Sequence, residues 1–432
     1  MSGGVYGGDE VGALVFDAGS HSFRVGYAGE EFPKLDIPSV VAVKEIEDED
    51  VEMKEQSLSG SGEKAEKQRK TFIGTTKIVV PRANTEMKTF MKDSMIDDWD
   101  LFEDTLDHIY GALSANSQYH PAFFTEPAWN ERAKREKLCE LMFEKYQVPA
   151  FHIVKNAVLT AFANGRTHGL IVDSGATHTS AVPVYEGYCI THAVVRSPIG
   201  GDLIADQLRL LLEQKNIDLV PYYRVASKEE VNENEPARWV EKKNLPAVTK
   251  SYEDYMKKLV LEDLAVSVLQ LCDTPIDMEF AEKLPSAPYS FPNGFTKEFL
   301  ADRVKVPEGL FDLSYLTDIP GKDSLMTVSQ IASTSIGMCD IDHRSALCSG
   351  LIVTGGNSLT LGFTERLNHD LALKCPPTSK LRVSAAVTPM ERRFGAWIGG
   401  SIVASLGTFQ QMWISKAEYD DSGRSIVEKK CP

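Results

Sequence analysis

The sequence predicts an α/β fold in which one structural unit is duplicated, giving two lobes around a cleft. Residues 13–30 read ALVFDAGSHSFRVGYAGE, and residues 169–187 read GLIVDSGATHTSAVPVYEG. Each copy has an apolar strand, an Asp-x-Gly turn with a small hydroxyl residue nearby, and a return strand that ends near a glycine. A third glycine loop, Gly355-Gly356-Asn357, follows another apolar run. The long separation of the two copies indicates a duplicated fold unit and not a short-period repeat array.

The remaining elements follow from periodicity in chain order. Residues 130–146 have a helical period, with Asn130 as a plausible N-cap, Pro149 as a stop, and an apolar face of Ala133, Leu138, Leu141, Met142 and Tyr146. Further helices are expected at residues 157–162 and 252–271, and buried strands at residues 169–172 and 351–354. Residues 228–246 and 285–320 are expected to form exposed connections and loops with short elements.

The composition and net charge limit the classes of protein to which the chain can belong. The chain has 432 residues, 43% of them hydrophobic, and a net charge of -16, which disfavours strong direct binding to DNA. The acidic charge suits basic partners, although most acidic proteins use it only for solubility. Seven cysteines without a C-x-x-C pair predict a reduced intracellular protein with no zinc site. The uncharged run from Phe394 to Ser415 is interrupted by glycines and glutamines, so we expect a core helix and no membrane span.

Residues 44–70 differ in character from the rest of the chain. Seven acids fall between Glu45 and Glu55, followed by SLSGSGEK and a basic cluster from Lys67 to Lys70. Such blocks predict a solvated insertion. The basic cluster fits a nuclear import signal, but a solvated basic patch is the simpler interpretation.

The two hairpins predict a phosphate site. Glycine lets the turn backbone approach a ligand, and successive amides form a nest for phosphate oxygens. Asp17 and Asp173, at the two strand ends, are expected to hold a hydrated Mg²⁺ that bridges to the phosphates. A single Asp-x-Gly turn would carry no weight, because ordinary hairpins use these residues for the turn itself.

Longer segments make the chain resemble actin. LVFDAGSHSFRVGYAGE and FANGRTHGLIVDSGATHT resemble its two phosphate loops, and TEPAWNERAKREKLCELMFEKYQVPAF and WIGGSIVASLGTFQQMWISKAEYDDSG resemble two further segments. The likeness spans nearly the whole chain except about residues 44–70 and 221–320. It implies ribonuclease-H-like halves and four subdomains around a nucleotide cleft. The outer lobe would comprise residues 1–163 and 395–432, with insertion 44–70, and the inner lobe residues 164–394, with a smaller subdomain at about 204–324.

The resemblance also implies the nucleotide contacts. ATP or ADP with Mg²⁺ would be bound by residues of the three loops and two flanking positions: Asp17, Gly19, Ser20, Arg24, Asp173, Gly175, Ala176, Thr177, Gly201, Gly355, Gly356, Asn357 and Arg393. Arg24 replaces a lysine and can still pair with phosphate. On the base side, Ala265 and Val266 replace a lysine and a glutamate, and Thr360 replaces an aromatic residue. One expectation is that the base binds by stacking on Arg393. The alternative is that the cleft is empty.

Two changes bear on hydrolysis. In actin a glutamine and a histidine align the attacking water. Asn156 stands at the glutamine position, and Ser180 at the histidine position, with His178 as the alternative if the hairpin gained residues. Because a misplacement of ~1 Å can cost ~100-fold in rate, we expect little or no hydrolysis and no catalytic residue.

Within the superfamily the chain resembles the actin-related protein four group, through MSGGVYGGDE, TEPAWN, NAVLTAFANG and SIGMCDIDHR. That resemblance implies a nuclear subunit of chromatin remodelling or histone acetyltransferase complexes, paired with monomeric actin on a long basic helix of the remodelling ATPase or acetyltransferase scaffold. Histones are a further candidate partner. The charged insertion and the terminal Pro432 argue against a homopolymer. The alternatives are an active actin-like ATPase or phosphotransferase and a cytoskeletal subunit.

Overall fold

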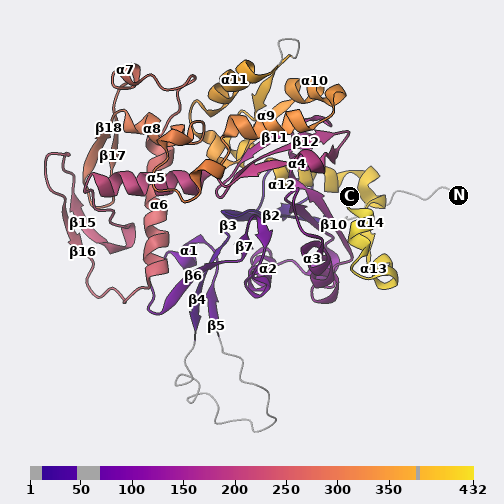
Figure 1. Cartoon of the computed structure of the whole chain (residues 1–432). Coiled ribbons are helices and arrows are strands. Elements are labelled where there is room, and N and C mark those ends of the chain that lie inside the picture. Colours follow the sequence, from indigo (N-terminus) through magenta and orange to yellow (C-terminus); the bar gives the residue numbers. More distant parts are fainter. Residues whose placement is uncertain (1–11, 46–68, 376–379) are drawn as a thin grey trace, which may run out of the picture.

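The two largest sheets of the protein lie in different lobes (Figure 1). The computed structural model describes residues 12–45, 69–375 and 380–432. The strand order is β21-β10-β9-β1-β2-β3 in the outer sheet and β13-β12-β11-β19-β20 in the inner sheet, where β14 also pairs with β12. In each sheet an antiparallel hairpin, β1–β2 or β11–β12, is joined by a parallel strand, β9 or β19. This shared arrangement confirms the predicted duplicated α/β fold.

The outer lobe contains the first sheet, its helices and a small projecting sheet. Its sheet strands are β1 Leu14–Ala18, β2 Ser22–Tyr27, β3 Leu35–Pro38, β9 Ala122–Glu126, β10 Ala150–Lys155 and β21 Ile414–Ser415. Its helices are α2 Trp99–Leu113, α3 Arg132–Glu144, α13 Lys416–Ser422 and α14 Ile426–Lys430. The projecting part has α1 Thr75–Ile78 and strands β4 Val40–Glu45, β5 Arg69–Phe72, β6 Thr85–Thr89, β7 Met91–Lys92 and β8 Met95–Ile96.

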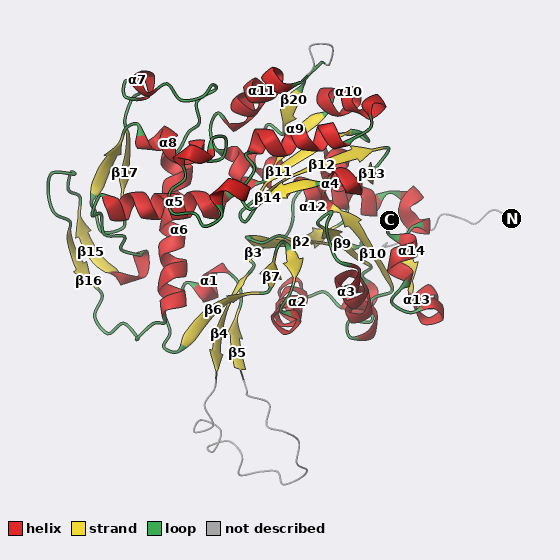
Figure 2. Ribbon diagram, viewed as in Figure 1, coloured by secondary structure: helices red, strands yellow, loops and turns green. Residues whose placement is uncertain are grey.

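The inner lobe contains the second sheet and most of the long helices. Its sheet strands are β11 Gly169–Ser174, β12 Thr179–Tyr185, β13 Tyr188–Cys189, β14 Val195–Ser197, β19 Leu351–Thr354 and β20 Val383–Ala385. Helices α9 Val328–Met338, α10 Ile341–Ser349 and α11 Phe363–Lys374 gather over this sheet (Figure 2). The smaller part has α5 Gly201–Gln214, α6 Lys250–Val268, α7 Met278–Ala281, α8 Asp302–Glu308 and strands β15 Val225–Glu229, β16 Arg238–Glu241, β17 Ala287–Ser290 and β18 Thr296–Phe299.

Two helices connect the lobes. Helix α4 (Asn156–Ala163) leads from β10 of the outer sheet toward β11 of the inner one, and α12 (Pro389–Ser405) leads from β20 back to the outer lobe. The two helices pack closely because α12 has a glycine where it crosses α4. A Cβ on Gly399 would lie only 1.9 Å from the carbonyl oxygen of Leu159 in α4. The two sheets draw their strands from the two predicted lobes, and the exact boundaries at 163/164 and 394/395 stay a prediction.

The structure corrects several local expectations. The helix predicted from Asn130 begins at Arg132 with Glu131 as its N-cap, because the Asn130 carboxamide accepts the Glu131 amide directly and lies outside the helix. Ala133 is exposed and does not join the apolar face. Trp129 and Trp239 are both half-buried.

Two predictions fall mainly on residues that the structure does not describe. Most of the predicted insertion 44–70, including Lys67 and Gln68 of the basic cluster, lies outside the described residues, as does the N-terminal segment MSGGVYGGDE.

The uncharged run at 394–415 forms the end of α12 and a short turn beyond it. Among the described residues, no helix has the length and apolar character needed to cross a membrane.

Candidate functional site

The first predicted loop is a tight turn after β1. Its backbone is closed by the Gly19 amide, which donates to the Ser22 carbonyl at 3.0 Å, and is supported by the Ser39 hydroxyl, which donates to the Gly19 carbonyl at 2.6 Å. Within the described residues, no hydrogen bond uses the amides of Ser20 and His21. The tip of the hairpin therefore offers two adjacent N–H groups, the arrangement that binds phosphate oxygens.

The second loop repeats this construction. The Gly175 amide donates to the His178 carbonyl at 3.0 Å, and no hydrogen bond between described residues uses the amides of Ala176 and Thr177. The carbonyls of Gly175 and Ala176 accept the first amides of α5, from Gly201 at 3.0 Å and from Asp202 at 2.8 Å. Gly201 thus supports the loop through its backbone.

Close packing at the second loop requires a glycine that the sequence pattern does not single out. A Cβ on Gly200 would lie 2.4 Å from the Ala176 carbonyl oxygen, so any side chain there would push α5 away from the loop.

The three loops meet at one place. The Thr177 hydroxyl donates to the Ser20 hydroxyl at 3.2 Å, which joins the two hairpin tips. The third loop lies against the second, since the Asn357 carboxamide donates to the Ser174 hydroxyl at 2.9 Å. A Cβ on Gly355 would lie 2.3 Å from Oδ1 of Asp173. The glycines predicted to allow close approach therefore do so around Asp173.

The two predicted metal carboxylates interact electrostatically. Asp17 accepts hydrogen bonds from Arg24 at 2.9 Å and from the Thr125 hydroxyl at 2.6 Å. Burial and the neighbouring Asp17 charge raise the pKa of Asp173 from 3.8 to about 6, and Arg24 opposes this only partly. Two carboxylates that repel each other beside unused amides are a donor set suited to a hydrated Mg²⁺ that carries phosphates. The residues present therefore fit the predicted group.

The raised pKa of Asp173 predicts opposite pH dependences without and with metal. The native carboxyl holds its proton up to about pH 6, whereas the unfolded one loses it near 3.8. The native state then binds more protons between these values, so the metal-free protein should lose stability as the pH rises from about 4 to 6. Mg²⁺ needs the charged carboxylate, so retention of a Mg-nucleotide should increase over the same range.

Melting temperatures measured across this pH range, with and without Mg-ATP, test the prediction. Asp173→Asn should remove the Asp173 contribution to both dependences. Profiles of the variant that match those of the unaltered protein would contradict the assignment.

A chain of charges extends from Asp17 along the outer lobe. Arg24 also approaches Asp36 of β3, with Nε 3.7 Å from Oδ1, and its guanidinium lies 5.3 Å from the centre of the Phe394 ring. This Nε is buried without a hydrogen-bond partner among the described residues. Arg24 thus has one nitrogen without a protein partner in the described part of the chain, and its contact with a phosphate stays a prediction.

Arg393, expected to stack on a base, contacts Asp36 and Phe394, and its role toward a base stays a prediction. Its Nη2 donates to Asp36 at 3.2 Å, and its guanidinium lies 5.4 Å from the centre of the same Phe394 ring. It therefore sits beside Arg24 at the start of α12.

Asn156 and Ser180 are the two positions expected to align the attacking water. Asn156 opens α4 directly after β10, at the same sheet edge as the end of β1, because β1, β9 and β10 are parallel. Ser180 is the cross-strand partner of Asp173, is 3% exposed and shares its face of the sheet.

His178, the alternative to Ser180, packs against the outer lobe. Its ring meets the Trp129 ring edge-on at 4.8 Å, and its Nδ1 lies 3.0 Å from the Thr177 hydroxyl. Burial, with a smaller contribution from Arg196, lowers the pKa of His178 to about 4. The ring is therefore neutral near pH 7 and is engaged in joining the lobes.

The positions expected at the base end offer few polar groups, and α6 faces the first loop with Glu262 instead, whose Oε2 lies 3.4 Å from Nε2 of His21. Val266 on α6 is 90% exposed and offers no polar group, and Ala265 is partly buried in the inner core. The Thr360 hydroxyl donates to the Asn357 carbonyl at 3.0 Å within its own loop.

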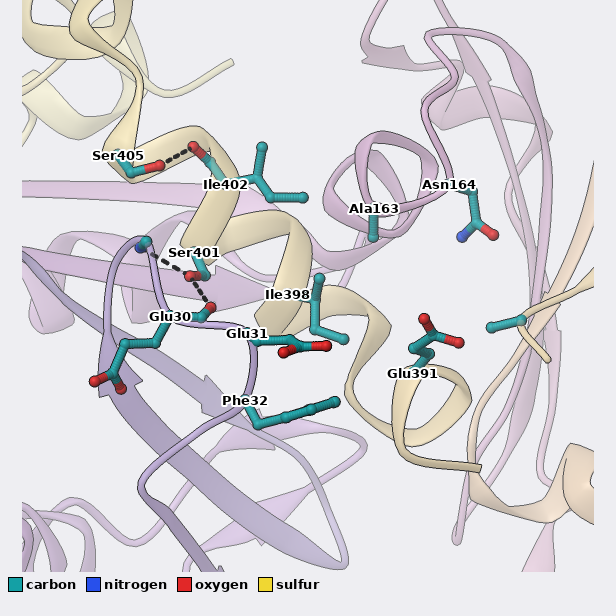
Figure 3. Close-up of a pocket in the computed structure, with 12 residues that line it drawn as sticks. Glu30, Glu31, Phe32, Ala163, Asn164, Glu391, Ile398, Ser401, Ile402 and Ser405 are labelled. Atoms are coloured by element: carbon teal, nitrogen blue, oxygen red, sulfur yellow. Dashed lines mark hydrogen bonds between the residues drawn. The ribbon is translucent and has the colours of Figure 1, made fainter. Parts of the chain in front are cut away.

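A second concavity lies outside the three loops, between α12, the end of α4 and residues 29–32 (Figure 3). It has a volume of about 440 Å³. Figure 3 shows the side chains of Glu31 and Phe32 extending toward Ile398. The Glu30 carboxylate points away from the pocket, and its Oε1 lies 2.8 Å from Nζ of Lys34, whereas Glu31 and Glu391 line the pocket. An apolar floor with carboxylates around it suits a ligand with both apolar and cationic groups.

Comparison with known proteins agrees with this architecture. The actin family matches residues 8–432. Proteins named Actin-related protein 4 are 39% identical in Arabidopsis thaliana and in Oryza sativa subsp. indica, in each case over 99% of this chain and 100% of the relative. The protein of the same name from Yarrowia lipolytica is 36% identical over 99% of this chain and 97% of its own length. The chain therefore belongs to the actin family and, within it, to the group of actin-related protein 4.

Proposed function

We propose that this protein is a non-polymerising nuclear subunit that holds a nucleotide and serves as a structural partner in chromatin-regulating assemblies. The observation that carries the nucleotide part is the pair of facing hairpins, each with two unused amides, around Asp17 and Asp173. Members of the actin family generally bind a nucleotide with a divalent metal, and the donors found here are of the kind that such a ligand needs.

In this proposal the ligand is ATP or ADP with Mg²⁺. The amides of the two tips and Arg24 would bind the phosphates, and Asp17 and Asp173 would hold the hydrated metal. Slow or absent hydrolysis is supported by the short Asn156, by Ser180 opposite Asp173, and by the engagement of His178 with Trp129. Phosphate released promptly in a single-turnover assay with bound ATP would favour the enzyme alternative.

The proposed partners are monomeric actin and a basic helix of a remodelling ATPase or acetyltransferase scaffold, with histones as a further candidate. The sequence resemblance described above and the net charge of -16 support this assignment. The pocket beside α12 adds a physical reason. An amphipathic helix binds by laying its apolar face in a groove, and lysines along that helix would pair with Glu31 and Glu391 of the lining.

A pair of variants tests the groove. Ile402 lines the pocket and is 42% exposed, so Ile402→Asp places a charge in the groove at little cost to folding. We expect at least a tenfold loss of binding to the basic-helix partner, because burying an unpaired carboxylate is unfavourable. The matched control is Met338→Asp on α9, which is 47% exposed and lies outside the pocket. Equal binding by both variants would contradict this use of the groove.

Purification from nuclei tests the assembly as a whole. The proposal expects co-purification with monomeric actin and chromatin-regulating subunits, and recovery of cytoskeletal proteins alone would refute it. Sedimentation at high concentration with Mg-ATP addresses the third alternative, since a pellet of the isolated protein would show polymerisation.

A further inference from the structure

The two lobes also contact each other directly at the N-terminal end of α6, through hydrogen bonds between protein groups. The N-terminal turn of α6, in the inner lobe, lies against α1 and β6 of the projecting part of the outer lobe (Figure 1). Four hydrogen bonds cross here, one of them from the Ser251 hydroxyl to the Glu86 carboxylate of β6. The Thr249 hydroxyl donates to the Thr85 carbonyl at 2.6 Å, the Met87 amide donates to the Ser251 hydroxyl at 3.1 Å, and the Tyr252 hydroxyl donates to the Val79 carbonyl at 2.7 Å.

The outer-lobe groups in these contacts have no partner in their own secondary structure. Strand β6 is the edge of the sheet β5-β4-β6, so the Thr85 carbonyl and the Met87 amide face away from β4. Val79 is the C-cap of α1, where carbonyls lack an intrahelical donor. Side chains of α6 therefore complete the hydrogen bonding of an edge strand and a helix end in the other lobe.

An apolar cluster surrounds these hydrogen bonds. Tyr252 is 1% exposed, and its ring meets the Tyr223 ring edge-on at 5.3 Å. Val79 and Met87 of the outer lobe pack onto the same cluster as Met256 of α6. Side chains from both lobes thus exclude water from one small interface.

We infer that Thr249, Ser251 and Tyr252 form a clasp that closes the cleft independently of any ligand. Two consequences follow. The lobes stay closed when the cleft is empty, and a ligand between the three loops enters or leaves only after the clasp has opened. The second consequence rests on the proposed nucleotide site, whereas the first does not.

The test uses the full chain and conservative variants. The double variant Tyr252→Phe with Ser251→Ala removes the three cross-lobe hydrogen bonds to Met87, Glu86 and Val79, and keeps the Tyr252 ring and the Thr249 N-cap. The control is Tyr289→Phe, because the Tyr289 hydroxyl donates to Asp263 at 2.7 Å within the inner lobe. Hydrogen exchange of the Met87 amide in nucleotide-free protein reports this contact, since Ser251 is its acceptor.

We expect exchange at Met87 to rise at least tenfold in the double variant and to stay unchanged in Tyr289→Phe. Because loss of the Ser251 acceptor alone exposes that amide, exchange at Met87 is also measured in Tyr252→Phe, which keeps Ser251 and should raise the exchange if the lobes separate. Unchanged exchange at Met87 in Tyr252→Phe would overturn the clasp.

Release of a fluorescent ATP analogue, followed after dilution into excess ATP, tests the second consequence. The clasp predicts release at least tenfold faster in the double variant than in Tyr289→Phe. Equal release rates, with exchange raised, would overturn control of ligand exit by the clasp. If exchange rises and the analogue does not bind at all, the clasp stands and the proposed nucleotide site fails.

Discussion

Replacing Gly399 with alanine is expected to destabilise the protein by on the order of 3 kcal/mol, because overpacking between closely fitted helices forces the backbone to move. A Cβ at this position would lie 1.9 Å from the Leu159 carbonyl oxygen, and a backbone oxygen cannot move aside as a flexible side chain can. Helices α4 and α12 would have to separate. Since both helices connect the lobes, the variant should also change the angle between them.

Thermal or denaturant unfolding measures the loss, with Gly111→Ala as the matched control. Gly111 lies in α2, and a Cβ added there would have no neighbouring atom within 4 Å, so alanine should raise stability by about 0.5–1 kcal/mol through helix propensity. If both alanine variants have the stability of the unaltered protein, the packing of α4 on α12 is looser than described.

Replacing Arg24 with alanine is expected to weaken nucleotide binding by about 100-fold. Two charge-assisted hydrogen bonds to phosphate at ~1.5 kcal/mol each give this factor. The change also leaves Asp17 without its 2.9 Å ion pair, close to Asp36 and Asp173. Calorimetric titration of nucleotide-free protein with Mg-ATP measures the effect.

Two further variants separate the roles of the neighbouring arginines. Arg24→Lys should restore most of the affinity, because an ammonium group also pairs with phosphate. Arg393→Ala should cost less than Arg24→Ala, since Arg393 donates to Asp36 and has no unpartnered buried nitrogen among the described residues. A larger loss for Arg393→Ala would favour the sequence-based expectation that Arg393 stacks on the base.

The sequence was sufficient for the fold and for the loops of the site. Both hairpins have a strong local signature, an apolar strand followed by Asp-x-Gly, and their duplication implied that they would face each other. The structure brings Ser20 and Thr177 within 3.2 Å, and the glycine of the third loop against Asp173. These relations follow from the way the strands pair and from the turn residues, both of which leave a signal in the local sequence.

Contacts between segments distant in sequence could not be predicted in this way. Thr125 donates to Asp17 because parallel pairing of β1 and β9 places them side by side, and no pattern around Thr125 signals it. Gly200 is required only because α5 abuts the Ala176 carbonyl. Arg393 was assigned by its position in an alignment, which cannot show that Asp36, on another strand, would bind its side chain.

The local error at Asn130 has a similar origin. Asn130 has good N-cap chemistry, but its carboxamide also donates to the buried Glu126 at 2.9 Å. This tertiary contact holds Asn130 before the helix, and the helix begins two residues later. Capping preferences worth about 1 kcal/mol do not outweigh a hydrogen bond to a buried carboxylate.

The central claim is that the cleft between Asp17 and Asp173 holds a nucleotide as a stable structural ligand. The most direct test is to purify the protein in Mg²⁺, incubate it, denature it and identify the nucleotide released. Stoichiometric ATP that persists through the incubation is the predicted result. No nucleotide, even after incubation with excess Mg-ATP, or prompt conversion of bound ATP to ADP, would contradict the account.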